Sequence, residues 1–305
     1  MIMEKFDVYA YGVIASSTMY LLKGEFPSKS GYAEFLKKYK NVGGEVANST
    51  LVLARLGLKV KLDGNWINPD EDADFLKNVF TDNQVDISSV SFQKCSGPKE
   101  MLVVDSKTRT IFGTYSQLSK EKSWNMPNEA DIENASLICL DPFFEKASLQ
   151  VAEFAAKHQK PFVTVDCKFD DPIFRTAAIT IISEEFLRDA YPGKEINEIT
   201  RKYLNETKGC VIFTFGSKEL LFGSQKEGLK QYTPFQINPK DTTGAGDSFR
   251  AGIIYGLFQK WEMTHTVAFA SALAALVCQS FPGVMNAPHL EQVISFMENN
   301  HHGFE

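Results

Sequence analysis

The chain has 305 residues and a formal net charge of −6 at pH 7, from 32 Lys and Arg against 38 Asp and Glu. This acidic balance argues against nucleic acid or an anionic membrane surface as the main partner. Hydrophobic residues make up 44% and charged residues 23%, which excludes a disordered chain and allows a sizeable buried core.

Short apolar runs that resemble buried strands alternate with amphipathic helical stretches along the chain. The expected strands lie at 6–14, 137–140, 162–165, 179–182 and 211–215. The expected helices include 145–158 and 195–205, the C-terminal part is helical and rich in Ala, and the tail 301–305 should fray. Such alternation predicts an α/β fold with a mostly parallel central sheet that is covered on both faces.

Two segments interrupt this alternation. Residues 16–41 are rich in Ser, Lys, Gly and Tyr, and residues 95–118 contain two short strand-like runs around a polar turn. We interpret both as insertions that form one small antiparallel sheet projecting from the main domain. The alternative is an ordinary hairpin at the edge of the core sheet.

The cysteines and the N-terminal segment indicate the cellular compartment of the protein. Five cysteines are far apart and form no CxxC pair: Cys95, Cys139, Cys167, Cys210 and Cys278. A scattered, odd set is typical of reduced core thiols in a cytosolic protein. We identify no signal peptide and no run of the roughly 18 apolar residues that a membrane span needs. We therefore expect a cytoplasmic protein without a membrane partner.

The most informative segment is DTTGAGDSFRAG, residues 241–252. Apolar residues at helical spacing follow it, so a helix should begin near Gly244, Ala245 and Gly246. These small residues let backbone N–H groups face a ligand, and the free N–H groups at the positive end of a helix form an anion site. Asp247 lies in the same first turn, where the helix dipole favours its ionised form.

An ionised carboxylate beside an anion site is the pair that phosphoryl transfer to an alcohol needs. Asp247 would take the hydroxyl proton as general base, while the amides of Gly244, Ala245 and Gly246 would neutralise charge on the transferring group. The alternative is a glycine-rich helix start whose Asp247 is only a favourable N-terminal charge.

The run closely resembles the C-terminal signature of the ribokinase-like (PfkB) carbohydrate kinases, D-T-x-G-A-G-D-x-F. Upstream, GGEVAN at 43–48 followed by ARLG at 54–57 resembles the first signature of that family. The resemblance covers roughly residues 6–297 and implies one domain, 1–305, with a Rossmann-like three-layer α/β/α architecture. It also implies that the segments of about 16–41 and 95–118 form a β lid over the sugar, and that the protein is a homodimer through this lid.

The resemblance assigns Gly43, Gly44 and Asn48 to substrate binding, because glycine amides can approach sugar hydroxyls and Asn supplies a donor and an acceptor. The family usually has an Asp in the first strand–loop that binds sugar hydroxyls. The matching stretch of this chain offers Ser17 instead. A serine removes a charge-assisted acceptor, so the recognised hydroxyl pattern should differ.

On the nucleotide side, the resemblance assigns Thr214, Gly216 and Ser217 to the T-x-G-x-x-G turn of the family, although Glu219 replaces the second glycine. Thr243 of the glycine-rich run belongs to the same cofactor site, and the implied cofactors are ATP and Mg²⁺.

The N-x-x-E motif of the family, linked to Mg²⁺, falls at 183–187, where the Asn is absent and the final Glu is replaced. Glu184 and Glu185 remain as metal residues that act through water, because Mg²⁺ keeps several waters. Some relatives bind a monovalent cation through backbone carbonyls near 241–243 and 281–283, so dependence on K⁺ stays open.

The resulting hypothesis is an ATP-dependent carbohydrate kinase that transfers the γ-phosphate to a hydroxyl of a sugar or sugar-like molecule. Position 45 is Glu, where some ribose kinases have Lys, so ribose is not the first acceptor that we expect. We identify no Arg or Lys cluster for a phosphorylated sugar, which favours an unphosphorylated one. Two alternatives remain: a nucleoside kinase of the same fold, and a catalytically silent sugar-binding protein, suggested by Ser17 and the altered N-x-x-E segment.

Overall fold

The main sheet has eight strands in the order β12-β11-β10-β9-β8-β7-β1-β4 in the computed structural model, which describes residues 6–105 and 108–300 and leaves the tail 301–305 outside. The strands from β4 to β10 pair in parallel, and β11 and β12 extend the sheet as an antiparallel hairpin. Their bounds are β1 (Phe6–Gly12), β4 (Val60–Gly64), β7 (Ala135–Leu140), β8 (Phe162–Val165), β9 (Ile179–Ser183), β10 (Cys210–Thr214), β11 (Leu220–Ser224) and β12 (Gly228–Tyr232).

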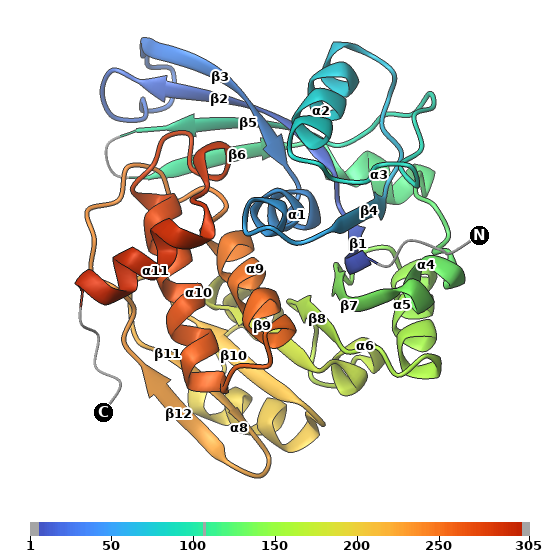
Figure 1. Cartoon of the computed structure of the whole chain (residues 1–305). Coiled ribbons are helices and arrows are strands. Elements are labelled where there is room, and N and C mark those ends of the chain that lie inside the picture. Colours follow the sequence, from blue (N-terminus) through green and yellow to red (C-terminus); the bar gives the residue numbers. More distant parts are fainter. Residues whose placement is uncertain (1–5, 106–107, 301–305) are drawn as a thin grey trace.

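Helices cover both faces of this sheet, as Figure 1 shows. One layer comprises α1 (Glu45–Arg55), α2 (Glu71–Asp82), α9 (Ala245–Phe258), α10 (Met263–Cys278) and α11 (Leu290–Asn299). The other comprises α4 (Glu129–Asn134), α5 (Lys146–Lys157), α6 (Pro172–Thr176), α7 (Glu184–Ala190) and α8 (Ile196–Glu206). Within the described residues, no helix has the length and apolar character needed to cross a membrane.

Strand alternation divides the buried side chains between the two layers. On β1, Val8 and Ala10 face the core under α1 and α9, whereas Tyr9 and Tyr11 face the core under α5. Successive side chains of a strand point to opposite faces, so a strand buried on both faces is apolar throughout. The three-layer α/β/α architecture predicted from the sequence is confirmed.

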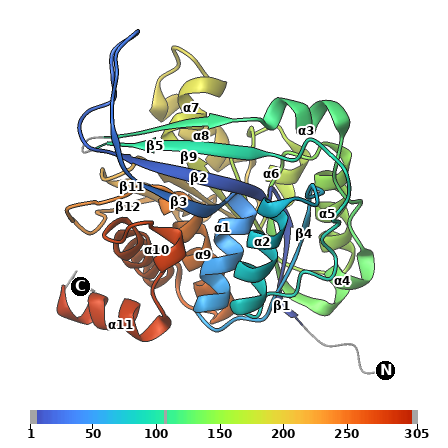
Figure 2. The ribbon, with the colours of Figure 1, turned by 90° about the horizontal axis from the view of Figure 1, so that it is seen from above.

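A second, four-stranded sheet has the order β3-β2-β5-β6 and lies along one edge of the α/β body, at the top of Figure 1. Its strands are β2 (Ala15–Leu22), β3 (Phe35–Gly43), β5 (Lys99–Val104) and β6 (Arg109–Gly113). The two outer pairings are antiparallel and the central pairing, β2 with β5, is parallel. Both inserted segments therefore meet in one small sheet, which Figure 2 shows from above.

Helix α9 is held tightly between α1 and α10. Gly252 makes the close approach to α10 possible, because a Cβ at this position would lie only 2.5 Å from the Cα of Ala270. Apart from its first turn and its C-terminal residues, α9 is buried. This packing fixes the position of its N-terminal turn beside the start of α1.

Candidate active site

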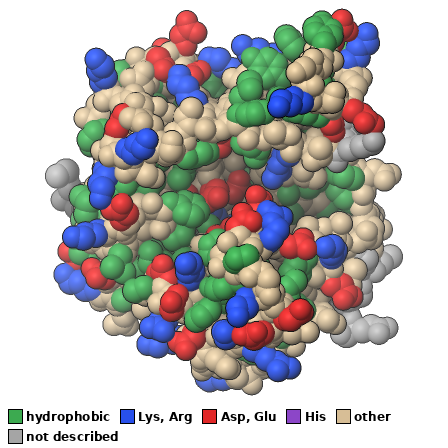
Figure 3. Space-filling model, turned by 180° about the vertical axis from the view of Figure 1, so that it is seen from behind, with side chains coloured by type: hydrophobic (Ala, Val, Ile, Leu, Met, Phe, Trp, Pro, Cys, Tyr) green, Lys and Arg blue, Asp and Glu red, His purple; other side chains and the backbone are tan. Residues whose placement is uncertain are grey.

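A cavity of about 550 Å³ lies between the small sheet and the carboxyl ends of the central strands. Ligands of open α/β sheets bind at this end of the strands. Figure 3 shows a hollow in the surface with acidic side chains gathered in it. Among the described residues, the cavity walls contain one cationic side chain, Arg109, and five carboxylates: Glu45, Glu100, Asp166, Glu185 and Asp247.

The N-terminal turn of α9 forms one wall. Gly244, the N-cap, has φ of 74°, and a Cβ added there would overlap Cγ2 of Val284. Glycine is therefore required by both the backbone conformation and the space. Gly244 and Gly246 line the cavity, whereas the amide of Ala245 donates to the carbonyl of Thr242 at 3.3 Å. Of the three predicted anion-binding amides, that of Ala245 thus already has a weak intramolecular partner.

Asp247 is partly open to the cavity and accepts a hydrogen bond from Asn48 Nδ2 at 2.8 Å. Burial raises its pKa from 3.8 to about 6; the positive charge of Arg250 and the bond from Asn48 oppose this shift, and the charges of Asp141 and Glu100 add to it. The group is therefore mainly ionised at neutral pH, as a general base must be.

The predicted substrate residues divide into two pairs. Gly44 and Asn48 line the cavity, and Asn48 Oδ1 is a buried acceptor without a partner among the described residues. Gly43 and Ser17 are not among the described residues that line the cavity, and Ser17 is only 3% exposed. A Cβ at Gly43 would overlap Oε2 of Glu100 and lie 2.8 Å from its Cδ, so this glycine makes room for a carboxylate.

A buried ionic network lies beneath Asp247. Arg250, one turn further along α9, donates from Nη1 to Asp141 Oδ1 at 2.6 Å and from Nε to Ser49 Oγ at 2.9 Å. Asp141 Oδ2 accepts the amides of Val13 and Val46 at 2.8 and 3.1 Å. Arg250 and Asp141 were not predicted from the sequence; an arginine within a largely apolar helix was the available signal.

Glu45, considered in the sequence only for its difference from some ribose kinases, is also a residue of the site. It lines the cavity from the first turn of α1, and its Oε2 is buried without a partner among the described residues. Burial raises its pKa well above the usual value, the charges of Asp141 and Asp247 raise it further, and Arg250 opposes the shift.

The opposite wall includes Asp166 and Glu185. Asp166 accepts the amide and the hydroxyl of Ser183 at 2.8 and 3.0 Å, and burial raises its pKa. Glu185 lines the cavity, whereas Glu184 lies outside it and pairs with Lys218 at 2.9 Å. The structure thus brings one of the two predicted metal residues to the cavity.

The predicted nucleotide residues are also divided. Thr214 and Thr243 line the cavity, and the buried Oγ1 of Thr243 has no partner among the described residues. Gly216 and Ser217 lie in the turn after β10 and are not among the described residues that line the cavity. The segments 241–243 and 281–283 lie side by side, since Asp241 accepts the amides of Thr243 and Gly283 at 2.9 and 3.1 Å.

Comparison with known sequences decides the family. The model of the family described as pfkB family carbohydrate kinase matches residues 33–289. The chain belongs to this family.

Several relatives of this PfkB kinase span most of its length. A 5-dehydro-2-deoxygluconokinase of Clostridium beijerinckii is 24% identical over 291 residues, which cover 86% of this chain and 85% of that protein. A ribokinase of Haemophilus influenzae is 25% identical over 272 residues, which cover 84% and 87%. The PfkB kinase is therefore a phosphotransferase with an alcohol acceptor, and the predicted enzyme class is confirmed.

Solved structures with the same fold include an Arabidopsis thaliana ribokinase complexed with ribose and ATP. It superposes with a TM-score of 0.79 at 18% identity and covers 96% of this chain and 99% of that one. A Methanocaldococcus jannaschii nucleoside kinase of the ribokinase family superposes with a TM-score of 0.76 at 18% identity and covers 97% and 99%. The ribokinase-like fold predicted for the PfkB kinase is confirmed, and the roles of single residues stay predictions.

Proposed function

We propose that the protein transfers the γ-phosphoryl group of ATP to a hydroxyl of an unphosphorylated sugar or sugar acid, with Asp247 as general base. The observation that carries this proposal is the position of Asp247 in the first turn of α9, open to the cavity and bonded to Asn48. A carboxylate with a pKa of about 6 is mostly ionised at pH 7 and still basic enough to take a hydroxyl proton.

The charge of the cavity supports an unphosphorylated acceptor. A phosphate group on the acceptor would need several cationic partners, but among the described residues the cavity walls hold one, Arg109, beside five carboxylates. One arginine is enough to pair with the carboxylate of a sugar acid. Since relatives are named 5-dehydro-2-deoxygluconokinase and ribokinase, the sugar acid and ribose are the first acceptors to test.

Each wall of the cavity has a part in this chemistry. Asp247 takes the proton of the acceptor hydroxyl, Asn48 fixes the carboxylate, and the amides of Gly244 and Gly246 stabilise negative charge that develops on the transferring group. The buried hydroxyl of Thr243 can donate a hydrogen bond to a phosphate oxygen, and Thr214 borders the same space.

Two cations belong to the proposal. Mg²⁺ supplies charge neutralisation on the phosphates when bound, and the carboxylates of Asp166 and Glu185 suit a hydrated ion because Mg²⁺ prefers oxygen ligands and keeps several waters. The adjacent segments 241–243 and 281–283 offer backbone carbonyls for K⁺. Gly216 and Ser217 remain proposed for the outer part of the nucleotide site.

We propose a homodimer through the exposed face of the small sheet. Large apolar side chains lie open on it, and apolar patches of this kind mark interfaces; on the face turned away from the cavity they are Phe35, Met101 and Phe112. We also propose a cytoplasmic location, which the five free thiols support.

The function is tested by ADP release from ATP and Mg²⁺ over a panel of D-ribose, D-fructose, D-gluconate, 5-dehydro-2-deoxy-D-gluconate and inosine. We expect one sugar or sugar acid to stimulate release, and Asp247→Asn to lower kcat by about 10²–10⁴-fold while acceptor binding is retained. Uniform background over the panel would favour a silent sugar-binding protein, and a preference for inosine would favour a nucleoside kinase. Comparable turnover by the variant would exclude Asp247 as the base.

A further inference from the structure

Glu100 of the small sheet places a carboxylate beside Ser17, the residue that stands where the family usually has an Asp. In the parallel pairing of β2 with β5, Glu100 lies opposite Ser17. Its side chain lines the cavity and takes the space that a side chain at Gly43 would need. Ser17 is buried beside Gly43, as the 3.2 Å between its Cβ and a Cβ added at Gly43 indicates. The group that faces the cavity here is therefore the carboxylate of Glu100.

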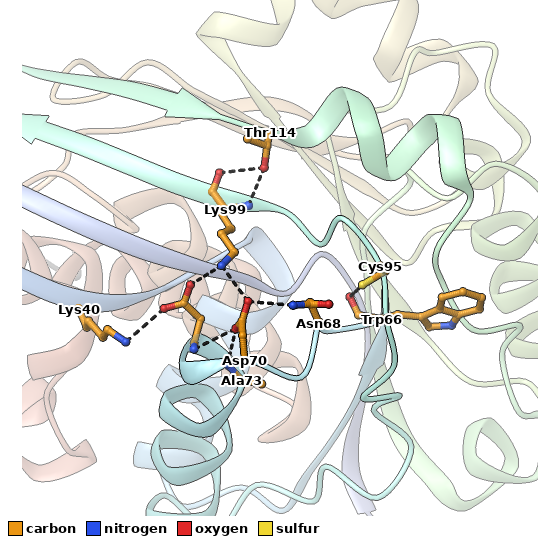
Figure 4. Close-up of polar contacts among 9 residues, drawn as sticks. Lys40, Trp66, Asn68, Asp70, Ala73, Cys95, Lys99 and Thr114 are labelled. Atoms are coloured by element: carbon orange, nitrogen blue, oxygen red, sulfur yellow. Dashed lines mark hydrogen bonds and ion pairs between the residues drawn. The ribbon is translucent and has the colours of Figure 1, made fainter.

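The preceding residue, Lys99, fixes the direction of the Glu100 side chain. Figure 4 shows Lys99 reaching the start of α2, where its Nζ contacts Asp72 and Asp70 at 2.7 and 3.0 Å. Lys40 of β3 pairs with the same Asp72 at 3.2 Å. Because successive side chains of a strand point to opposite faces, anchoring Lys99 on α2 turns Glu100 toward the cavity.

Tyr115 holds the carboxylate from the other side. The backbone of Lys99 is bonded to Thr114, whose Oγ1 accepts the Lys99 amide at 2.9 Å and whose own amide donates to the Lys99 carbonyl at 3.1 Å. The residues that follow this pair, Glu100 and Tyr115, are thereby brought together, and the Tyr115 hydroxyl donates to Glu100 Oε1. The charge of Glu100 also contributes to the raised pKa of Asp247, so the two carboxylates of the cavity are close enough to repel each other.

We propose that Glu100 determines acceptor specificity, by accepting hydrogen bonds from hydroxyls of the acceptor other than the one that receives the phosphate. This inference rests on the proposed kinase function and names the class of acceptor: a polyhydroxy compound with a free hydroxyl at that position. Hydrogen bonds to a carboxylate are stronger than neutral ones. A carboxylate has about four lone-pair sites. The hydrogen bond from Tyr115 therefore leaves further acceptor sites on the Glu100 carboxylate free.

The same carboxylate disfavours other acceptors. A compound that lacks the hydroxyl leaves Glu100 without that second partner in the complex, which costs affinity. A phosphate ester at the same position meets a like charge. Glu100 therefore acts by selection against deoxy and phosphorylated compounds as well as by attraction.

The test measures acceptor binding by isothermal titration calorimetry without nucleotide. The probes are D-ribose, D-fructose, D-gluconate and 5-dehydro-2-deoxy-D-gluconate, each with monodeoxy analogues. We expect Glu100→Gln to weaken binding of the preferred probe by about 10–100-fold, the range for a hydrogen bond to a charged group. The matched control Glu34→Gln, an exposed glutamate of the β2–β3 loop, should change it less than twofold.

The analogues separate recognition from structural damage. For the monodeoxy analogue that lacks the recognised hydroxyl, we expect the unmodified protein and Glu100→Gln to bind equally weakly, whereas a structural defect would weaken all probes alike. A Gly43→Ala variant provides a second route, because its Cβ would displace the Glu100 carboxylate. The double variant Gly43→Ala, Glu100→Gln should bind the preferred probe no more weakly than Glu100→Gln alone.

Three results would overturn the proposal: unchanged affinity in Glu100→Gln, an equal loss for every probe and analogue, or no probe bound by the unmodified protein. The kinase function is judged separately from ADP release. Binding of a sugar that depends on Glu100 but without any ADP release would reject the proposed reaction and retain the role of Glu100.

Discussion

Arg250 Nη1 lies 2.6 Å from Asp141 Oδ1, and both side chains are completely excluded from solvent. The other oxygen of Asp141 accepts the amides of Val13, after β1, and Val46, in the first turn of α1. Helix α1 has no side-chain cap of its own at Gly44, so Asp141, the residue that follows β7, supplies one from a distant part of the chain. The ion pair thus fastens α9, α1 and the end of β1 beneath Asp247.

Removing one partner of this pair should destabilise the whole domain. We expect Arg250→Met to lower the free energy of unfolding by about 3–5 kcal/mol, because it leaves the charge of Asp141 buried and uncompensated. Urea unfolding measures this change. Arg188→Met is the matched control, since Arg188 is 69% exposed beside Asp189 and should change stability by about 0.5 kcal/mol or less. Equal stability of the two variants would contradict the role of the pair.

The sequence predicted the parts of this protein that local pattern determines. The start of α9 follows from its glycines and the apolar residues behind them, and the parallel sheet follows from five apolar runs. The antiparallel hairpin β11–β12 was missed, because two strands of only five residues, the second with exposed Lys230 and Gln231, give a weak pattern. Strand β4 was missed as well, since a run of five residues that includes Lys61 and Asp63 does not look buried.

The site residues that the sequence did not predict are brought together by contacts between distant segments of the chain. Arg250 meets Asp141 across 109 positions of the chain, and Glu100 enters the cavity only through its register with Ser17. No spacing in a single sequence gives either contact. For the same reason the sequence does not reveal that the absence of a side chain at Gly43 leaves space for Glu100, while contact of the Gly43 amide with sugar hydroxyls stays a prediction.

The raised pKa of Asp247 predicts the acid limb of the pH profile. A general base acts in its unprotonated form, so kcat/KM should fall tenfold per pH unit below about pH 6 and level off above it. Steady-state rates between pH 5 and 8, with saturating ATP and Mg²⁺, measure this limb. A limb near pH 4 would show that burial does not raise the pKa of the working base.

The same shift has a consequence for stability. Because the pKa of Asp247 is higher in the folded protein than its ordinary 3.8, its ionisation opposes folding above pH 6, and this cost disappears as the pH falls toward 4. We expect Asp247→Asn to unfold at a higher temperature than the unmodified protein at pH 8, with a smaller difference at pH 5. Thermal unfolding at both pH values measures it, and a less stable variant at pH 8 would contradict the shift.

Gly244 should not tolerate a side chain. Its φ of 74° strains any L-residue, and a Cβ would overlap Val284. We expect Gly244→Ala to lose about 1–3 kcal/mol of stability and at least tenfold in kcat, because the α9 turn must move. Gly24→Ala is the control, since nothing lies within 4 Å of a Cβ there. Unchanged kcat in Gly244→Ala would show that the N-terminal turn of α9 takes no part in the reaction.

Adjacent glutamates on α7 give a matched test of the metal site. Glu185 lines the cavity, whereas Glu184 pairs with Lys218 outside it. We expect Glu185→Gln to raise the Mg²⁺ concentration for half-maximal rate by about tenfold, in the range for losing a group that orients the ion through water. Glu184→Gln should leave it unchanged. Equal effects of the two variants would place the ion elsewhere.

The exposed apolar face of the small sheet predicts the oligomeric state. Met101 of β5 and Phe112 of β6 lie opposite each other on this face and are 41% and 46% exposed, and Phe35 of β3 is 58% exposed. We expect light scattering after size exclusion to give about twice the chain mass of 34.2 kDa. A Met101→Glu, Phe112→Glu double variant should be monomeric, because two charges in an apolar interface are costly to bury. Ile294→Glu, at an exposed apolar residue on α11, should leave the mass unchanged. A monomeric unmodified protein would exclude the dimer, and a dimer that resists the double variant would exclude this face as its interface.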